Sequence, residues 1–171
     1  MSELRAPAVL ADPVVSPVGF RNPHDGAALL QVLDAYARDP MGGGEPLPEE
    51  VRDALLPSLA GFPGAFAFLA RVEGAPVGIT ICFMGFSTFA ARPLVNIHDL
   101  AVLPAFRGRG IGRALLARVE TEARMRGACK ITLEVLSGNH SAKRLYESLG
   151  CSDYTLDPEA GNALFWQKRL T

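Results

Sequence analysis

One stretch of the chain, residues 100–112 (LAVLPAFRGRGIG), constrains the fold more than any other. It begins with an apolar strand end and continues past Pro104 into a short turn rich in arginine and glycine. An amphipathic helix follows at once, because apolar residues recur every fourth position from Ile111 to Ala123. The first amides of a helix lack internal partners and carry partial positive charge. The stretch therefore predicts an anion site at a strand–turn–helix junction.

The length and composition predict one globular domain over residues 1–171, with residues 1–13 as a loose, proline-containing tail. The composition is 49% apolar and 20% charged, which is enough apolar material for a continuous core. The net charge is -1, which disfavours a nucleic-acid partner. Arg107, Arg109 and Arg113 nevertheless gather in one turn. This local charge suits a small anionic ligand better than a polyanion.

The chain has three cysteines, Cys82, Cys129 and Cys151, and no two of them have the spacing of a metal or redox motif. We expect them to be reduced packing residues. Three scattered histidines predict no metal site. No signal peptide is evident in residues 1–20, and the most apolar run, residues 77–91, is too short to span a bilayer. We therefore expect a cytoplasmic protein with no membrane partner.

The periodicity predicts an α/β chain, specifically an α+β mixed sheet with helices on its faces. The expected elements are a strand near 14–20, helices over 22–39 and 48–59, strands over 65–72, 76–86 and 94–103, a helix over 111–126, a strand over 130–136, a helix over 140–149, and final strands near 153–156 and 163–170. Residues 39–46, with three consecutive glycines, are expected to form a mobile loop. Pro57 is expected to end or bend the second helix, and Phe165 and Trp166 are expected to lie in the core.

The glycine turn fits neither of two common phosphate motifs. The dinucleotide fingerprint Gly-x-Gly-x-x-Gly fails because Arg113 or Leu115 stands where its third glycine is required. The P-loop sequence Gly-Lys-Ser/Thr is absent as well. The pattern that does fit is Arg-x-x-Gly-x-Gly at Arg107, Gly110 and Gly112.

With this pattern the chain resembles the GNAT superfamily of N-acetyltransferases, whose Gln/Arg-x-x-Gly-x-Gly/Ala signature lies between the fourth strand and the next helix. The downstream sequence LEVLSGNHSAKRLYESLGC adds an Asn and a helix that carries a Tyr. The resemblance is strong over residues 97–154, while over residues 1–90 only the order of elements agrees. It implies the GNAT fold, a mostly antiparallel twisted sheet of about six to seven strands, splayed at strands 4 and 5 and flanked by about four helices.

The resemblance implies acetyl-coenzyme A as co-substrate and no metal. Backbone amides of the turn would cradle its pyrophosphate, and unpaired backbone of the fourth strand would hold the pantetheine arm and polarise the thioester carbonyl. The implied coenzyme-binding residues are Leu100, Ala101, Val102, Arg107, Gly108, Arg109, Gly110, Ile111, Gly112, Asn139, Ala142 and Tyr146.

Three of these residues belong to the helix near residue 140. In the family, the position of Asn139 bonds the pantetheine arm, although Asn also suits a helix N-cap. Tyr146 stands where the family places a tyrosine near the coenzyme sulfur, so its phenol can protonate the departing thiolate; the alternative is a core tyrosine. Ala142, four residues before it, leaves room for the arm.

The candidate general bases are His98 and Asp99, just before the coenzyme-binding part of the strand. Adjacent strand residues point to opposite faces, so both can reach the acceptor only if the strand is bulged. Some relatives carry Glu-Asp here. The alternative to either base is solvent, with His98 and Asp99 as a hydrogen-bonded structural pair.

The predicted reaction is acetyl transfer to a primary amine of a small molecule, by direct attack in a ternary complex. The acceptor is expected between residues 39–46 and residues 87–93. A protein N-terminal or lysine acetyltransferase, an enzyme for longer acyl groups, a non-catalytic acyl-coenzyme A sensor and a nucleotide-binding module remain as alternatives. Homodimers are frequent in the family, so a homodimer is one possible assembly. The sequence leaves the acceptor, the acyl preference and the base open.

Overall fold

The computed structural model describes residues 11–155, 157, 159 and 161–170. Its contacts divide the chain into two units, residues 1–132 and 133–171, and each unit is described by itself. The single-domain expectation stays a prediction. Most of the expected tail, residues 1–10, lies outside the described residues, and residues 11–13 precede the first strand.

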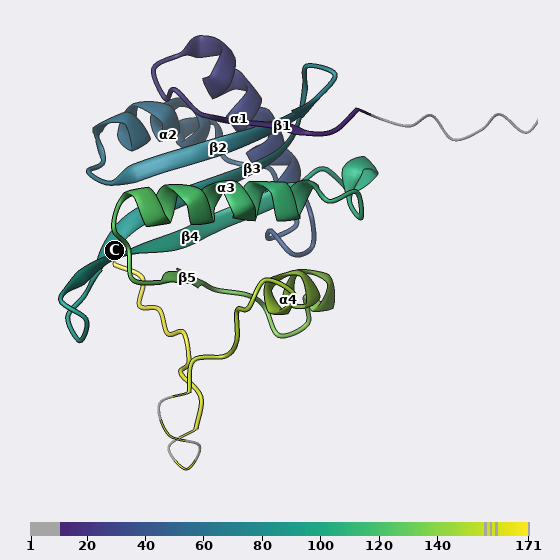
Figure 1. Cartoon of the computed structure of the whole chain (residues 1–171). Coiled ribbons are helices and arrows are strands. Elements are labelled where there is room, and N and C mark those ends of the chain that lie inside the picture. The colour runs from purple at the N-terminus through teal and green to yellow at the C-terminus, as the bar shows by residue number, and fades with distance from the viewer. Residues whose placement is uncertain (1–10, 156, 158, 160, 171) are drawn as a thin grey trace, which may run out of the picture. The chain divides into compact units, whose positions relative to one another are not determined.

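The chain builds one five-stranded sheet in the order β1-β2-β3-β4-β5 (Figure 1). The strands are β1 (Val14–Pro17), β2 (Ala65–Val72), β3 (Ala75–Ser87), β4 (Arg92–Val102) and β5 (Ile131–Leu133). The first four pair antiparallel, and β5 runs parallel to β4. Glu73 and Gly74, with φ of 50° and 83°, make the two-residue turn between β2 and β3. Such a turn needs positive φ at both positions, which Gly74 adopts readily and Glu73, as a non-glycine residue, adopts at some cost.

The helices are α1 (Pro23–Ala37), α2 (Glu49–Gly61), α3 (Ile111–Met125) and α4 (His140–Glu147), with a short 3₁₀ turn, η1 (Pro104–Phe106), before α3. Asn22 caps α1 as predicted, because its side chain accepts from the amides of His24 and Asp25. Pro57 does not end α2, which continues to Gly61. The turn after Pro57 carries Leu59, whose burial against the sheet stabilises that turn.

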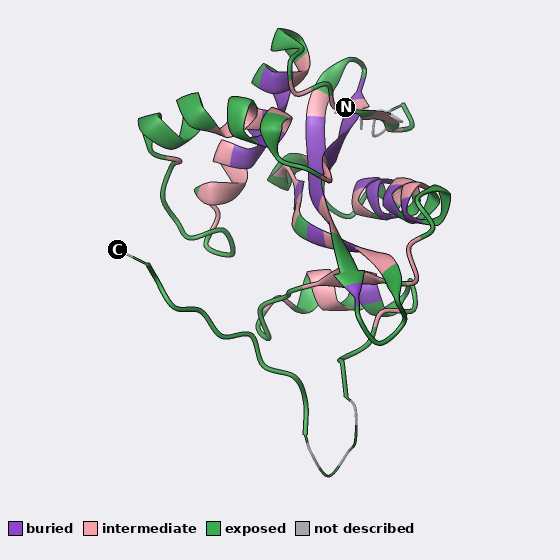
Figure 2. Cartoon of the chain, turned by 90° about the vertical axis from the view of Figure 1, so that its left-hand side faces the viewer, coloured by how far each residue is buried: buried purple, intermediate pink, exposed green. Residues whose placement is uncertain are grey.

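Helices cover both faces of the sheet in the first unit. One core joins α1 and α2 to β2, β3 and β4, with Leu29, Val32 and Ile79 fully buried in it. On the other face, α3 lays Arg118 over the Phe68 ring at 4.6 Å, and its residue Leu115 is fully buried. Figure 2 shows the buried residues concentrated in the central strands, α1 and α3. This confirms the apolar face predicted for the helix that begins at Ile111.

The second unit contains α4 and the C-terminal segment. The two strands expected near residues 153–156 and 163–170 are not formed in the described residues, where an isolated bridge joins Thr155 and Asn162. Phe165 and Trp166, expected in the core, are 73% and 83% exposed. The continuous apolar run of Leu164, Phe165 and Trp166 indicates a strand buried on both faces, but all three side chains are exposed. The sheet therefore has five described strands where six to seven were expected.

Among the residues that the structure describes, no helix is long and apolar enough to cross a membrane.

Candidate active site

The strand β4 is bulged at the candidate base. Ile81 on β3 pairs with Asp99, whereas the next residue, Cys82, pairs with Ile97. Two residues of β4 therefore advance against one of β3, and His98 is the extra residue. The bulge is the condition under which His98 and Asp99 can share a face, and it lies immediately before residues 100–102.

Both side chains face the α1 and α2 side of the sheet. The His98 ring meets the ring of Phe83 edge-on, with 5.5 Å between the centroids. Phe83 packs against the core that α1 and α2 form with the sheet. Asp99 acts electrostatically on Tyr36, the penultimate residue of α1. The two candidate bases are thus on the same side, although which of them accepts a proton stays a prediction.

The surroundings of Asp99 alter how its carboxyl group titrates. Burial raises the pKa of Asp99, and the nearby His98 partly opposes that rise. Burial also raises the pKa of Tyr36, and the charges of Asp99 and Asp39 add to the shift. A carboxylate with a raised pKa holds a proton more tightly than a solvated one, which suits a general base. The electrostatics are therefore compatible with Asp99 taking a proton from an ammonium group.

Beyond the bulge, every second residue of β4 directs its backbone N–H and C=O groups away from β3. The Leu103 amide donates to the Val77 carbonyl on β3 at 2.9 Å, so the polar groups of Val102 point the other way. There the Val102 carbonyl accepts from Arg107 Nε at 3.1 Å. The hydrogen bonds from β4 toward β5 lie further back, at Pro93 and Val95. This arrangement is compatible with the predicted pantetheine-binding edge at residues 100–102.

The glycine turn before α3 has the backbone that an anion site needs. Gly108 and Gly110 have φ of 73° and 80°, values that favour glycine. Gly110 is the N-cap of α3 and offers no side-chain cap, so the amides of Ile111 and Gly112 have no side-chain acceptor in that position. A Cβ added to Gly110 would meet no protein atom within 4 Å. The turn thus fits a pyrophosphate, whose seat a side chain at residue 110 would fill.

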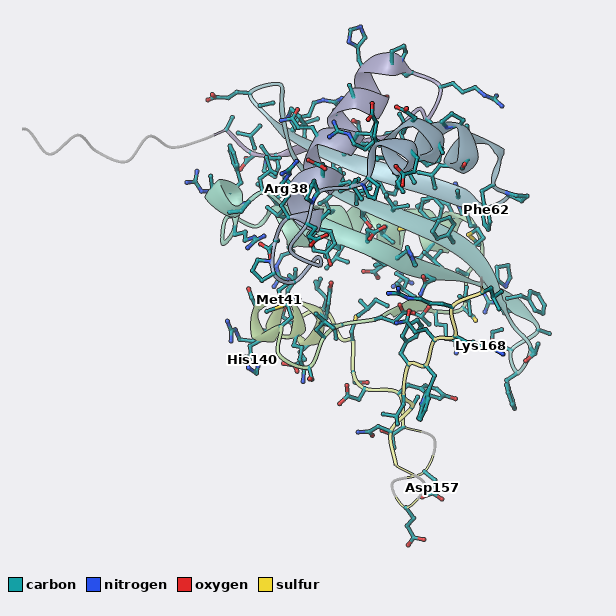
Figure 3. All side chains as sticks on the ribbon, turned by 180° about the vertical axis from the view of Figure 1, so that it is seen from behind. Arg38, Met41, Phe62, His140, Asp157 and Lys168 are labelled. Carbon is teal, nitrogen blue, oxygen red and sulfur yellow. The ribbon has the colours of Figure 1, made fainter. Side chains whose placement is uncertain are left out.

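Arg107 ties this turn to the loop between α1 and α2. Its guanidinium donates to Asp39 Oδ2 at 2.8 Å as well as to the Val102 carbonyl. Asp39 also accepts from the amide of Met41, the residue labelled in Figure 3, and the Met41 carbonyl accepts from the Tyr36 hydroxyl at 3.3 Å. The loop that was expected to be mobile is therefore held by a set of hydrogen bonds. The side chain of Arg107 is committed within the protein, which leaves its backbone for the predicted anion contact.

Asn139, Ala142 and Tyr146 belong to the second unit. Asn139 caps α4, since its Oδ1 accepts from the Ala142 amide at 3.1 Å. The structural alternative for Asn139 is thus confirmed, and its bond to a pantetheine arm stays a prediction. Tyr146 is buried on α4 with 8% of its surface exposed. Its role as an acid also stays a prediction.

The cysteines show neither a reactive thiol nor a metal site in the described residues. Cys82 is fully buried next to the Thr80 hydroxyl, and burial raises the pKa of its thiol to about 11. It is therefore protonated at neutral pH and unsuited to act as a nucleophile. Cys129 and Cys151 are half-buried. Within the described part of the chain, no group of three metal-ligating side chains comes together.

Comparison with known proteins places the chain in a family. Residues 26–151 match the Acetyltransferase (GNAT) family, and the chain belongs to it. An uncharacterised N-acetyltransferase of Methanocaldococcus jannaschii is 38% identical over 84 residues, which is 48% of this chain and 37% of that protein. The thialysine N-epsilon-acetyltransferase of Mus musculus is 35% identical over 79 residues, 46% of each chain. The matches thus span less than half the length of these two relatives.

The fold agrees with that of a solved N-acetyltransferase. An aminoglycoside N-acetyltransferase in complex with CoA superposes with a TM-score of 0.70 at 17% identity, covering 93% of this chain and 96% of that one. At this identity the likeness concerns the fold alone. The GNAT fold expected from the sequence is confirmed, as a mixed sheet with four helices.

Two residues near the candidate base, Tyr36 and Phe83, were not expected there, because they were placed only within a predicted helix and a predicted strand. Asp39 was expected at the start of the acceptor loop, residues 39–46. Tyr36 could have been found from its position near the end of the helix that leads into this loop. Phe83 has no such local signal, because its contact with His98 depends on the register between β3 and β4.

Proposed function

We propose that the protein transfers the acetyl group of acetyl-coenzyme A to the primary amine of a small molecule, by direct attack in a ternary complex. The observation that carries the proposal is the bulge of β4 at His98. It turns His98 and Asp99 to one side of the strand directly before residues 100–102. A proton acceptor and the backbone that would hold a thioester thus follow one another on a single strand.

The residues present fit the coenzyme. Backbone amides of residues 107–112 would take the pyrophosphate, with Gly110 leaving the space that a side chain would occupy. The outward backbone groups of Leu100 and the amide of Val102 would align the pantetheine arm, and a bond from Asn139 to the arm is what the family resemblance implies. When bound, acetyl-coenzyme A supplies an acetyl group activated as a thioester.

The protein's own groups would move two protons. An amine is mostly protonated at neutral pH and must lose a proton before it can attack. Asp99, or His98 beside it, would accept that proton on the α1 and α2 side of the sheet. The Tyr146 hydroxyl would donate a proton to the departing thiolate, and the second proton that the nitrogen loses as the amide forms would replace it. Backbone N–H groups at residues 100–102 would stabilise the developing negative charge on the carbonyl oxygen.

A small-molecule acceptor is favoured over a protein or a polycation. The expected acceptor segments, residues 39–46 and 87–93, carry few charges. The carboxylate of Asp39 is already paired with Arg107. The mouse relative, named for a small amine, supports the same choice.

An acceptor panel that measures release of the free coenzyme A thiol tests the proposal. The panel contains small primary amines, free lysine, and peptides with a free N-terminus or an internal lysine. We expect release with one or more small amines and little with the peptides. Release with peptides alone would show a protein acetyltransferase instead. Tight binding of acetyl-coenzyme A with no release from any amine would show a sensor.

A further inference from the structure

Three aromatic rings make a row that begins at the candidate base His98, itself exposed, and ends at Phe62 beside α2. The His98 ring contacts Phe83 with 5.5 Å between the centroids, and Phe83 contacts Phe62 with 5.2 Å. Both contacts are edge-to-face, with interplanar angles of 76° and 75°. Phe62 directly follows α2 and is 57% exposed (Figure 3). We call these three residues the aromatic row.

The aromatic row lies on the same side of the sheet as Asp99. Phe83 packs against the core shared with α1 and α2, and Asp99 acts on Tyr36 of α1. Asp99 and His98 are adjacent residues of the bulge. A molecule whose amine lies at Asp99 therefore meets aromatic carbon as soon as its chain extends toward α2.

The sheet surface beyond the row adds apolar contacts and few polar ones. Asn96 pairs with Phe83 across the strands, but its amide nitrogen donates to Thr132 Oγ1 at 3.2 Å. The next pair along is Gly85 with Leu94, and a Cβ on Gly85 would lie 2.9 Å from Leu94 Cδ1. An acceptor tail along this surface would thus meet rings and Leu94.

Negative charge is concentrated at one point of this surface. In β3 and β4, every residue of which is described, Asp99 is the sole carboxylate. Asp39, the other acid that acts on Tyr36, is paired with Arg107. These two strands therefore offer an acceptor one carboxylate, whereas a polyamine or an aminoglycoside would bring several charges that need partners.

We infer that the acceptor is a monoamine whose short carbon chain ends in an aromatic or bulky apolar group. The ammonium group lies at Asp99 before its proton is removed, and the apolar group lies against Phe83 and Phe62. Burying such a group against the rings contributes to binding in proportion to the apolar area removed from water. The inference deepens the proposed acetyl transfer and rests on it.

The test compares three amines by kcat/KM for thiol release from acetyl-coenzyme A. They are 2-phenylethylamine, ethanolamine, which lacks the ring, and spermidine, which carries several charges. We expect 2-phenylethylamine to exceed each of the others by about tenfold or more, as an apolar group in a complementary site commonly does. Equal or higher kcat/KM for ethanolamine or spermidine would overturn the inference and leave the acetyltransferase proposal standing.

Two variants test whether the preference for 2-phenylethylamine depends on the aromatic row. Phe62→Ala removes a half-exposed ring and should reduce the ratio between 2-phenylethylamine and ethanolamine several-fold, mainly through the KM of the former. Phe86→Ala is the matched control, because Phe86 is 63% exposed and strand alternation puts it on the face of β3 opposite to Phe83, and it should leave the ratio unchanged. A ratio that Phe62→Ala does not alter contradicts the inference. Absence of thiol release with every amine would contradict the acetyltransferase proposal, and the inference would fall with it.

Discussion

Replacing Gly110 by alanine should separate the coenzyme contact from fold stability. Gly110 has φ of 80°, a backbone conformation that costs an L residue about 1 kcal/mol. The added methyl group meets no protein atom within 4 Å, so no internal clash adds to that cost. For a chain of this length, about 1 kcal/mol corresponds to a melting temperature lower by about 2–4 °C.

Binding should fall much further than stability. The methyl group would project from the N-cap of α3 into the space assigned to the pyrophosphate. Losing one charge-assisted hydrogen bond from a turn amide costs about 1.5–3 kcal/mol, which raises the Kd for acetyl-coenzyme A by about ten- to a hundredfold. Isothermal titration calorimetry measures the Kd, and differential scanning calorimetry measures the melting temperature.

Gly127→Ala is the matched control at the other end of α3. Gly127 has φ of 69°, and a Cβ there also meets nothing within 4 Å. The two variants should therefore lose similar stability, while Gly127→Ala keeps the wild-type Kd. Equal Kd values for wild type, Gly110→Ala and Gly127→Ala would refute the assignment of the turn as the pyrophosphate seat.

Three further variants test the groups around the reaction. Asp99→Asn should lower turnover and remove the acidic limb of the pH–rate profile; an unchanged limb would exclude Asp99 as the base. Because burial raises the pKa of Asp99, its stability contribution is complete below the ordinary value of 3.8 and is lost as the pH rises through the folded-state pKa. The melting temperature of Asp99→Asn relative to wild type should therefore increase with pH over that window, and a constant difference would contradict the buried carboxylate. Tyr146→Phe should lower kcat with little change in the Kd for acetyl-coenzyme A, and full turnover would remove the acid role. Asp39→Asn breaks the pair with Arg107, whose side chain is 51% exposed, so it should cost under about 1 kcal/mol of stability. It should nevertheless raise the KM of the amine several-fold. An unchanged KM would show that the loop takes no part in acceptor binding.

The parts of the fold that depend on local sequence could be predicted. The start of α3 at Ile111 follows from the glycine turn and the four-residue apolar period, and its end follows from Arg126 and Gly127. The hairpin turn at Glu73 and Gly74 follows from Gly74, which adopts positive φ readily, although Glu73 at φ of 50° does not follow from its residue type. In both cases the residues that specify the structure are neighbours in the chain.

The features that depend on pairing between distant segments could not be predicted. The bulge at His98 is a property of the register between β3 and β4, and the sequence of β4 alone does not show it. The pair of Asp39 with Arg107 joins residues 68 positions apart. The prediction for the C-terminal segment was wrong for a different reason. The apolar run through Trp166 indicates a buried strand, whereas the Trp166 side chain is 83% exposed. Apolar composition does not supply a surface to pack against.

Mass spectrometry of both products and protein tests the central claim most directly. The protein is incubated with acetyl-coenzyme A and the best amine of the panel, and the N-acetylated amine, free coenzyme A and intact protein are measured together. Direct attack in a ternary complex predicts equal amounts of N-acetylated amine and free coenzyme A, with the mass of the protein unchanged throughout. Bound acetyl-coenzyme A that yields no N-acetylated amine, or an acetylated protein formed before the amine is added and consumed by it, would contradict the account.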